Sequence, residues 1–378
     1  MSTGQADAEP CPRRAGADAA VAALAGRAAA LVVVRAASRL DPEQVLAGIR
    51  SVTGATPLVG GSSTTAFGSR GAQQADVVVS ALGGAGLSAA TASSAAPDPR
   101  RRGAEVAGAL AAVTGAHRVL LVVPDGLDFS LGELVRGVYD VAGPTTPVVG
   151  GGAAAVVGLE QTFQLHDGRV LRRGAVAAAL GSDRPFGVGV RHGVRRVGEA
   201  LVVTESTGVE VLTLDGEPAL DVYLSRLDAP AAARYDGAAF AAFAQLHPLG
   251  LARRRREEVR VVVGADLRRR TLHFVTPVPQ GGLLWLMEGD TASVLHAARE
   301  ACDEAVAGLG GHPVAGLLVH SCVARQQILG EAGVAAEVAS VREAAGAGAS
   351  ALTHSFGEIA RTTGYAGVHN QTLVALAV

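Results

Sequence analysis

The sequence contains few aromatic residues and few cysteines, and it carries almost no net charge. Aromatic side chains make up 3% of the 378 residues, so alanine and valine supply most of the 49% that is hydrophobic. The three cysteines, Cys11, Cys302 and Cys322, lie far apart and form no CxxC pair, which argues against a disulfide scaffold and a zinc ribbon. A formal net charge of −2 provides no overall field that would draw the chain to nucleic acid or to a membrane.

Long apolar segments and the common catalytic motifs are also absent from the sequence. No apolar run reaches about 18 residues without a charge or a glycine, so no membrane span is expected, and the protein is predicted to be cytoplasmic. There is no GxSxG, HExxH or CxxCH motif, which leaves the common hydrolase layouts and covalent haem attachment without support. The basic run at 253–256 is balanced by two following glutamates and predicts a solvated loop rather than a nucleic-acid contact.

What the sequence does contain is a recurring unit. Each copy begins with an apolar strand, continues through a helical stretch and a second strand with a Gly- or Ser-rich end, and finishes with another apolar strand. The copies cover residues 31–82, 119–180 and, in a more divergent form, 316–378. A unit that recurs at near-constant spacing is one supersecondary block used several times. The expected fold class is therefore α/β, with repeated strand-helix-strand units forming mixed sheets in two domains.

Composition and local signals divide the chain further. Residues 1–28 are rich in alanine and predict a disordered or helical tail, and the texture changes after Gly181, so we place a domain boundary near 185. Asp41-Pro42 and Asp290 predict helix starts, and Asp167-Gly168 predicts a hairpin turn. The two prolines and three arginines within 92–102 predict a solvent-exposed loop.

Several short motifs occur in the order and spacing of one family. They are residues 187–198 and 214–223, the His-Pro-Leu-Gly stretch at 247–250, Ser321-Cys322 with Arg325, the Phe-Gly-Glu-Ile stretch at 356–359 and the His-Asn-Gln-Thr stretch at 369–372. Together they resemble the FIST family over nearly the whole chain. The resemblance implies a FIST N-terminal domain at 29–185 and a FIST C-terminal domain at 186–378. Four positions depart from the family pattern. Val194 stands where an aromatic residue is frequent and Arg196 where a proline is frequent, His320 replaces a usually apolar residue, and His354 lies where aromatic residues are usual.

The resemblance implies an intracellular sensory protein that binds a small ligand and signals through a separate protein partner. It leaves two alternatives open. The first is a haem b protein, either a nitric-oxide sensor or a haem-dependent enzyme, with His320 or His354 as the axial ligand. The second is a haem-free enzyme of specialised metabolism that uses Cys322 or a histidine as its acid–base group. Neither nucleic acid nor a membrane is expected as a partner.

The candidate ligand-binding residues lie at strand ends, where α/β proteins usually bind their ligands. They are His320, Cys322, Arg325, His354, Gly357, Glu358, His369, Asn370, Ser62 and Ser63. Each has a purely structural alternative. The histidines can be satisfied by backbone carbonyls, and Cys322 can be a small core residue. Arg325 can form a surface salt bridge instead of clamping the carboxylate of a ligand, and Glu358 can cap nearby amides. The glycines beside Ser62 and Ser63 can serve close packing of the repeated units instead of a ligand.

Overall fold

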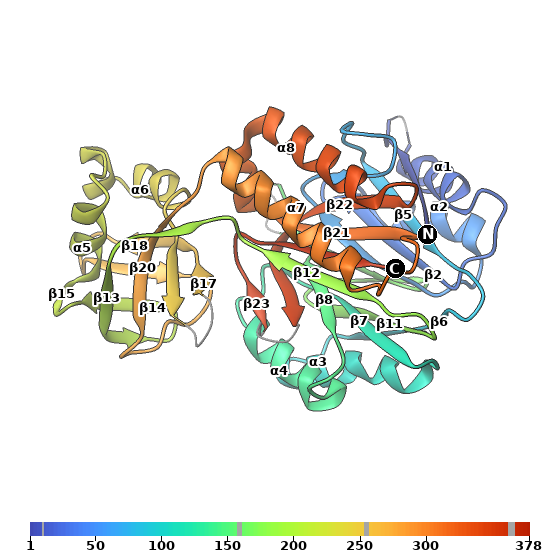
Figure 1. Cartoon of the computed structure of the whole chain (residues 1–378), viewed down its shortest axis with the longest axis horizontal. Helices are drawn as coiled ribbons and strands as arrows, with labels where there is room; N and C mark the ends of the chain where they lie inside the picture. The colour runs from blue at the N-terminus through green and yellow to red at the C-terminus, as the bar shows by residue number, and fades with distance from the viewer. Residues whose placement is uncertain (10, 157–160, 253–256, 362–366) are drawn as a thin grey trace.

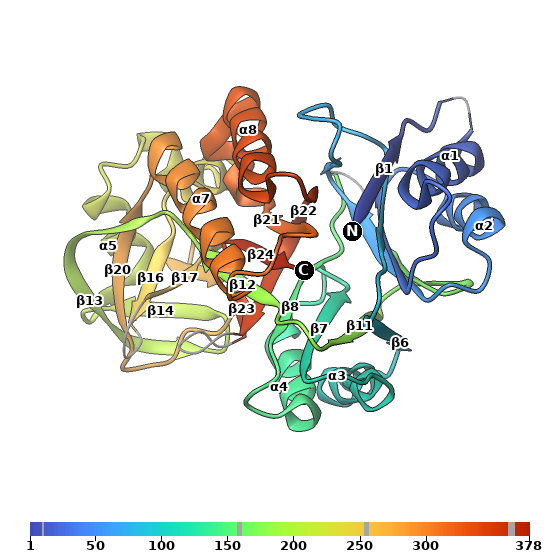
Figure 2. The ribbon, with the colours of Figure 1, turned by 45° about the vertical axis from the view of Figure 1, so that its right-hand side comes forward.

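Three β-sheets organise the chain in the computed structural model, which describes residues 1–9, 11–156, 161–252, 257–361 and 367–378. Two of the sheets pack face to face in the main body of the molecule (Figures 1 and 2). The third forms a separate lobe, seen on the left of Figure 1. The expected α/β class, with helices and strands in mixed sheets, is confirmed.

The first sheet has six strands in the order β1-β5-β2-β3-β9-β10. Its elements are β1 (Ser2–Ala6), α1 (Pro12–Leu24), β2 (Leu31–Ala37), α2 (Pro42–Thr53), β3 (Leu58–Ser63), β5 (Val77–Leu82), β9 (Gln164–His166) and β10 (Arg169–Leu171). Alternating side chains explain its two buried faces. Val32 and Val34 pack against α1 and α2, whereas Leu31 and Val33 face the second sheet.

The second sheet has ten strands, and its main path runs β12-β24-β21-β22-β8-β7-β11-β6. These strands are β6 (Ser88–Ser94), β7 (His117–Pro124), β8 (Val148–Gly152), β11 (Ala175–Ser182), β12 (Gly187–Arg191), β21 (Gly316–Cys322), β22 (Ala349–Arg361) and β24 (Leu373–Ala377). The short strands β4 (Ala66–Phe67) and β23 (Val368–His369) also pair with β22. The helices on its outer face are α3 (Pro99–Ala107), η1 (Gly108–Ala112), α4 (Leu131–Ala142), α7 (Thr291–Ala307) and α8 (Val323–Ala345).

One order of elements recurs three times in these two sheets. Along the chain, the elements of each unit follow one another in the order outer strand, helix, first inner strand, second helix, second inner strand and last strand. The two inner strands are called the first and second strands below. In space the strands lie as β1-β5-β2-β3, β6-β11-β7-β8 and β12-β24-β21-β22. In each unit the first and second strands are parallel, and the last strand pairs antiparallel with the first. The second and third units join through antiparallel pairing of β8 with β22.

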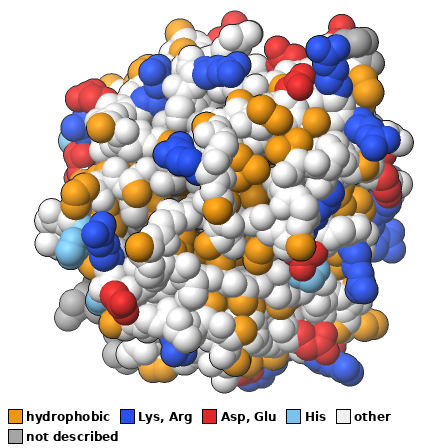
Figure 3. Space-filling view, turned by 90° about the vertical axis from the view of Figure 1, so that its right-hand side faces the viewer, with side chains coloured by type: hydrophobic (Ala, Val, Ile, Leu, Met, Phe, Trp, Pro, Cys, Tyr) orange, Lys and Arg blue, Asp and Glu red, His pale blue; other side chains and the backbone are white. Residues whose placement is uncertain are grey.

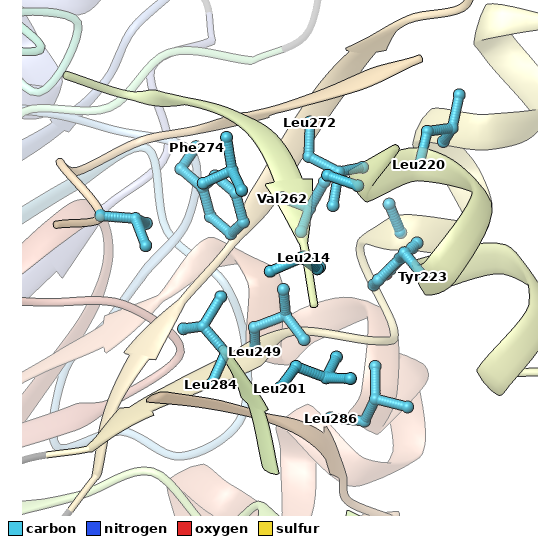
Figure 4. Packing of buried hydrophobic residues seen from close by; sticks show 14 of the residues in the cluster. Leu201, Leu214, Leu220, Tyr223, Leu249, Val262, Leu272, Phe274, Leu284 and Leu286 are labelled. Carbon is cyan, nitrogen blue, oxygen red and sulfur yellow. The ribbon is translucent and has the colours of Figure 1, made fainter. Parts of the chain in front are cut away.

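The third sheet lies between β12 and α7 in the sequence and forms the separate lobe. Its strands are β13 (Arg195–Thr207), β14 (Glu210–Leu214), β15 (Glu217–Pro218), β16 (Leu249–Ala252), β17 (Glu257–Arg260), β18 (Val262–Asp266), β19 (Thr271–Phe274) and β20 (Leu283–Glu288). Its helices are α5 (Ala219–Arg226), η2 (Ala231–Arg234) and α6 (Gly237–Ala244). The lobe has its own core, in which Tyr223 and Phe240 pack with leucines from several strands (Figure 4). The chain therefore crosses between body and lobe twice, at 192–194 and at 289–290.

The structure corrects two expectations. Residues 1–28 contain the expected helix as α1, but they also contain strand β1, which pairs antiparallel with β5 and is not a tail. The stretch 92–102 is not a loop. It ends strand β6 and begins α3, because Asp98 caps the helix by accepting bonds from two backbone N–H groups and Pro99 occupies the first turn. The basic run at 253–256 lies outside the described residues.

Surface charges are mixed where Figure 3 shows them. On that face arginines and acidic side chains are interspersed among apolar patches. All 33 basic residues of the chain are arginines, because the sequence contains no lysine. No helix in the described part of the chain is long and apolar enough to cross a membrane.

Candidate functional site

The carboxyl ends of β21 and β22 carry most of the candidate residues. The two strands are parallel, and their register places His320 beside Thr353 and Ser321 beside His354. Neighbours in register share a face of the sheet, and successive residues alternate between faces. His320 therefore faces the first sheet, where its Nδ1 lies 3.3 Å from Nη2 of Arg35. His354 faces α8, so the structure separates the two histidines that the sequence suggested could line one hollow.

A buried ion pair dominates the α8 side of the sheet. Arg325 donates to Oε1 of Glu337 from Nε at 3.1 Å and from Nη2 at 2.6 Å, and neither side chain has any solvent exposure. The hydroxyl of Ser321 donates to the other carboxylate oxygen, at 2.9 Å. The ring of His354 lies next to this pair, with Nε2 at 3.9 Å from Glu337. Burial lowers the pKa of His354 to about 4, although the nearby carboxylate opposes that shift, so the ring is neutral at physiological pH.

The same arginine bonds the first crossing between body and lobe and the start of α7, which directly follows the second crossing. Its Nη1 donates to the carbonyl of His192, which follows β12, at 3.0 Å. Its Nη2 donates to the carbonyl of Val294, in the first turn of α7, also at 3.0 Å. Arg325 therefore matches neither of the two roles considered for it from the sequence. It forms a salt bridge that is buried instead of lying on the surface, and it also bonds the backbone at His192 and Val294.

A short polar chain extends from this ion pair to the first unit. Thr65 contacts Nδ1 of His354 through its hydroxyl, which also accepts a bond from Gln326 at 3.0 Å. The hydroxyl of Ser63 donates to the backbone carbonyl of His354 at 2.9 Å. Ser62 lies apart from this chain, because its hydroxyl accepts a bond from the backbone N–H of Phe163.

Glu358 occupies a separate buried cluster on the side of the sheet that faces the first unit. Its two carboxyl oxygens accept bonds from Ser355 and Thr372, each at 3.0 Å, and it contacts the thiol of Cys322. Burial raises the pKa of Glu358 to about 8, so this carboxyl keeps its proton at neutral pH. Burial also raises the pKa of the Cys322 thiol well above its usual value, which makes the thiol a weak nucleophile.

The remaining candidates support the backbone around this cluster. Gly357 has φ 75° and lies at the register shift between β22 and β8, where a bulge needs a left-handed residue. His369 pairs with Glu358 across the strands, and its Nε2 contacts the carbonyl of Ala360 at 3.0 Å. Asn370 donates to the carbonyl of His369. The contact of His369 Nε2 therefore agrees with the structural alternative, in which a backbone carbonyl satisfies the imidazole.

A groove of about 600 Å³ lies between the lobe and the beginnings of α7 and α8. The sequence assigned no ligand-binding role to its residues, although Val197 and His247 lie in family motifs and Asp290 was expected to cap a helix. The lining includes Val197, His247, Met287, Asp290, Gln327 and Ile328. Gln327 and Ile328 follow Arg325 by two and three residues on the same helix, so the buried ion pair lies close behind the groove wall.

Comparison with protein families identifies the chain. The FIST N domain model matches residues 29–217, and the FIST C domain model matches residues 219–361. The chain therefore belongs to the FIST family. FIST domains are small-ligand-sensing signalling domains in general, and the two matches place the chain in that broad class. A comparison with curated proteins finds no match.

The histidines of the third unit do not fit a haem group in this structure. His320 lines a cavity of only about 20 Å³, which has room for a water molecule or a small ion. His354 is 1% exposed and lies between the sheet and α8. Within the described residues, neither imidazole faces a space of porphyrin size. His247, in contrast, lines the groove of about 600 Å³ between the lobe and the body.

Proposed function

We propose that the chain is a sensor that binds a small organic ligand in the groove between lobe and body and transmits binding as a change in the lobe's position. The observation that carries the proposal is the placement of Arg325. Its guanidinium bonds the carbonyl of His192, in the first crossing, and the carbonyl of Val294, in the turn of α7 that follows the second crossing. Its helix also supplies Gln327 and Ile328 to the groove wall. A ligand that shifts this wall shifts the group that bonds both of these segments.

The groove favours a ligand with a positive charge. Asp228, Glu288 and Asp290 contribute three carboxylates to the lining, against one guanidinium from Arg226, and Glu288 also pairs with Arg195 at its edge. The remaining lining mixes apolar side chains with the polar side chains of His247, Thr291 and Gln327. A groove with a few charged groups among apolar ones suits a small molecule that has one charged end and one apolar end. An organic amine has this chemistry.

Transmission needs an element with two arrangements, and the kinked helix α8 provides a candidate. Gly330 has φ 60° and ψ −178°, so it interrupts the helix between Arg325 and Glu337. A ligand that binds one arrangement better than the other shifts the population towards it. We propose that a separate signalling protein reads the resulting position of the lobe.

A panel of amines tests the proposal, with thermal unfolding of the full chain as the measurement. Gln327→Trp fills the groove wall with a large side chain, and Ala336→Trp places the same side chain on an exposed position of the same helix. We expect at least one amine to raise the melting temperature of the wild type and of Ala336→Trp, but not of Gln327→Trp. An amine that stabilises all three proteins equally would place its site elsewhere.

Haem is a second candidate occupant of the same groove, and one observation favours it. Nδ1 of His247 lies 2.8 Å from the carbonyl of Phe243, which can only accept, so Nδ1 carries the proton and Nε2 keeps a lone pair. A backbone hydrogen bond of this kind orients many metal-binding histidines. Met287 lines the groove as well. When bound, haem would supply iron that binds a diatomic gas.

Absorption spectroscopy separates the two occupants. If haem binds there, purified protein mixed with haemin develops a Soret band that shifts in His247→Ala but not in His320→Ala. If haemin produces no protein-specific Soret band, or the same band in both variants, His247 is not an axial ligand.

A further inference from the structure

A buried arginine without a carboxylate partner lies between the two sheets of the body. Arg35 is on β2 and is 6% exposed. It shares the inward face of β2 with Val33, and it meets His320 on β21 across the layer between the sheets. Within the described residues, no carboxylate forms an ion pair with it. Burial lowers the pKa of Arg35 to about 10, so the guanidinium still carries its charge at neutral pH.

The contact between Arg35 and His320 fixes the proton on the imidazole. A guanidinium can only donate hydrogen bonds, so Nδ1 of His320 must accept. The neutral ring then carries its proton on Nε2. That Nε2 is buried and has no partner in the described part of the chain, and the same holds for Nε of Arg35. Two buried N–H donors and one positive charge are therefore left unsatisfied at one place.

Both residues line the cavity of about 20 Å³ between the sheets. Ser80 of β5 and Thr353 of β22 add hydroxyls to its wall, and the rest of the lining is apolar. A cavity of this volume holds one water molecule or one monatomic ion, and it is too small for phosphate or a carboxylic acid. Gly151 preserves the neighbouring space, because a Cβ there would lie 3.0 Å from Nδ1 of His320.

We propose that this cavity binds a single halide ion, chloride under ordinary conditions, held by Arg35 and His320. An isolated buried charge is unfavourable by many kcal/mol unless an opposite charge accompanies it. A water molecule accepts hydrogen bonds but brings no charge, whereas a halide satisfies the donors and neutralises the guanidinium together. The ion would join β2 of the first unit to β21 of the third. The site is separate from the groove and does not depend on the function proposed there.

Thermal unfolding at constant ionic strength tests the site. The full chain is melted in sodium chloride mixed with sodium gluconate, whose anion is too large for the cavity. A ligand that binds only the folded state stabilises that state more as the ligand concentration rises. Once the chloride concentration exceeds the dissociation constant of the site, we expect the melting temperature to rise by about 2 °C for each tenfold increase in chloride. Arg35→Met removes the charge and should abolish this dependence. Arg118→Met, at an exposed position of β7, is the matched control and should keep it.

Bromide crystallography tests the site without any variant. Crystals of the wild type grown in sodium bromide should give an anomalous peak within hydrogen-bond distance of Nε of Arg35 and Nε2 of His320. A cavity that shows no anomalous peak there would overturn the proposal, because it would then hold water or nothing. A melting temperature that does not respond to chloride in the wild type, or that responds equally in Arg35→Met, would also overturn it.

Discussion

Arg325 and Glu337 form an ion pair across the kink of a single helix, with both side chains fully buried. Gly330 breaks α8 between them, so the pair ties its short first segment to its long second one. The first segment begins directly after β21, and the second covers the sheet. Because Arg325 also bonds the carbonyls of His192 and Val294, this one pair connects the sheet and α8 to the first crossing and to the start of α7, which follows the second crossing.

Removing one partner of this pair should destabilise the protein strongly. Arg325→Met leaves the carboxylate of Glu337 buried without a counter-charge, and we expect the free energy of unfolding to fall by about 3–5 kcal/mol. Arg325→Met combined with Glu337→Met should recover much of that loss. The matched control is Arg299→Met, which removes solvent-exposed pairs with Asp303 and Glu343 and should change stability by at most about 1 kcal/mol. Urea unfolding measures all of these, and equal losses in Arg325→Met and Arg299→Met would contradict the account.

The buried carboxyl of Glu358 makes stability depend on pH in a definite direction. Its pKa is about 8 in the folded protein, against an ordinary value of 4.5. Between these values the folded state keeps a proton that the unfolded state has lost, so the folded state becomes relatively less stable as pH rises through this window. Below pH 4.5 both states are protonated, and above pH 8 the difference is constant.

Glu358→Gln removes this titration and preserves a neutral side chain of the same shape. We expect the variant to gain stability relative to the wild type as pH rises from about 4.5 to about 8, by a total on the order of 4 kcal/mol. Comparing the two proteins cancels the opposing contribution of the buried histidines, whose lowered pKa values reduce stability as the pH falls below 6.5. A difference in melting temperature that stays constant over this range would show that Glu358 is ionised in the folded state.

The cysteines should differ sharply in reactivity. Cys11 is exposed, whereas Cys302 and Cys322 are buried, and burial raises the pKa of the Cys302 thiol to about 12. Because the thiolate is the reacting form, we expect iodoacetamide to modify Cys11 in the native protein and the other two only after unfolding. Peptide mass spectrometry measures the three rates. Modification of native Cys322 as fast as that of Cys11 would instead support a catalytic thiol.

Close packing of β12 against α7 predicts that Gly189 tolerates no side chain. A Cβ at this position would overlap the backbone carbonyl of Ala301. We expect Gly189→Ala to lower the free energy of unfolding by at least about 2 kcal/mol. Gly132→Ala in α4 has nothing within 4 Å of the added Cβ and should leave stability unchanged or raise it by up to about 1 kcal/mol. Similar behaviour of the two variants in urea unfolding would contradict the packing at β12.

The elements that local chemistry determines could be predicted from the sequence. Asp41 and Asp290 cap helices as expected, and Asp167 adopts the left-handed turn conformation between β9 and β10. The same chemistry was overlooked at Asp98-Pro99, where three arginines suggested a loop. One of those arginines, Arg102, is buried by its bond to Asp128, a partner 26 residues away that no local pattern reveals.

The arrangement of the strand-end histidines could be predicted only in part. Their positions at strand ends led to the prediction that His320, His354 and His369 lie near one edge of the sheet. The sequence did not show that His320 and His354 face opposite sides of the sheet, because the face to which each side chain points depends on where its strand begins. The groove could not be predicted, since residues from the lobe and from α8 meet there only through the tertiary fold. The partner of His320, Arg35, lies 285 residues earlier in the chain.

The most direct test of the proposed function is a crystal structure of the full chain with the most stabilising amine of the panel. The account predicts electron density for the amine in the groove, with its charged end near Glu288 and Asp290 and its apolar end near Met287 and Ile328. An amine bound elsewhere on the molecule, with the groove free of it, would contradict the proposal that ligands act between lobe and body.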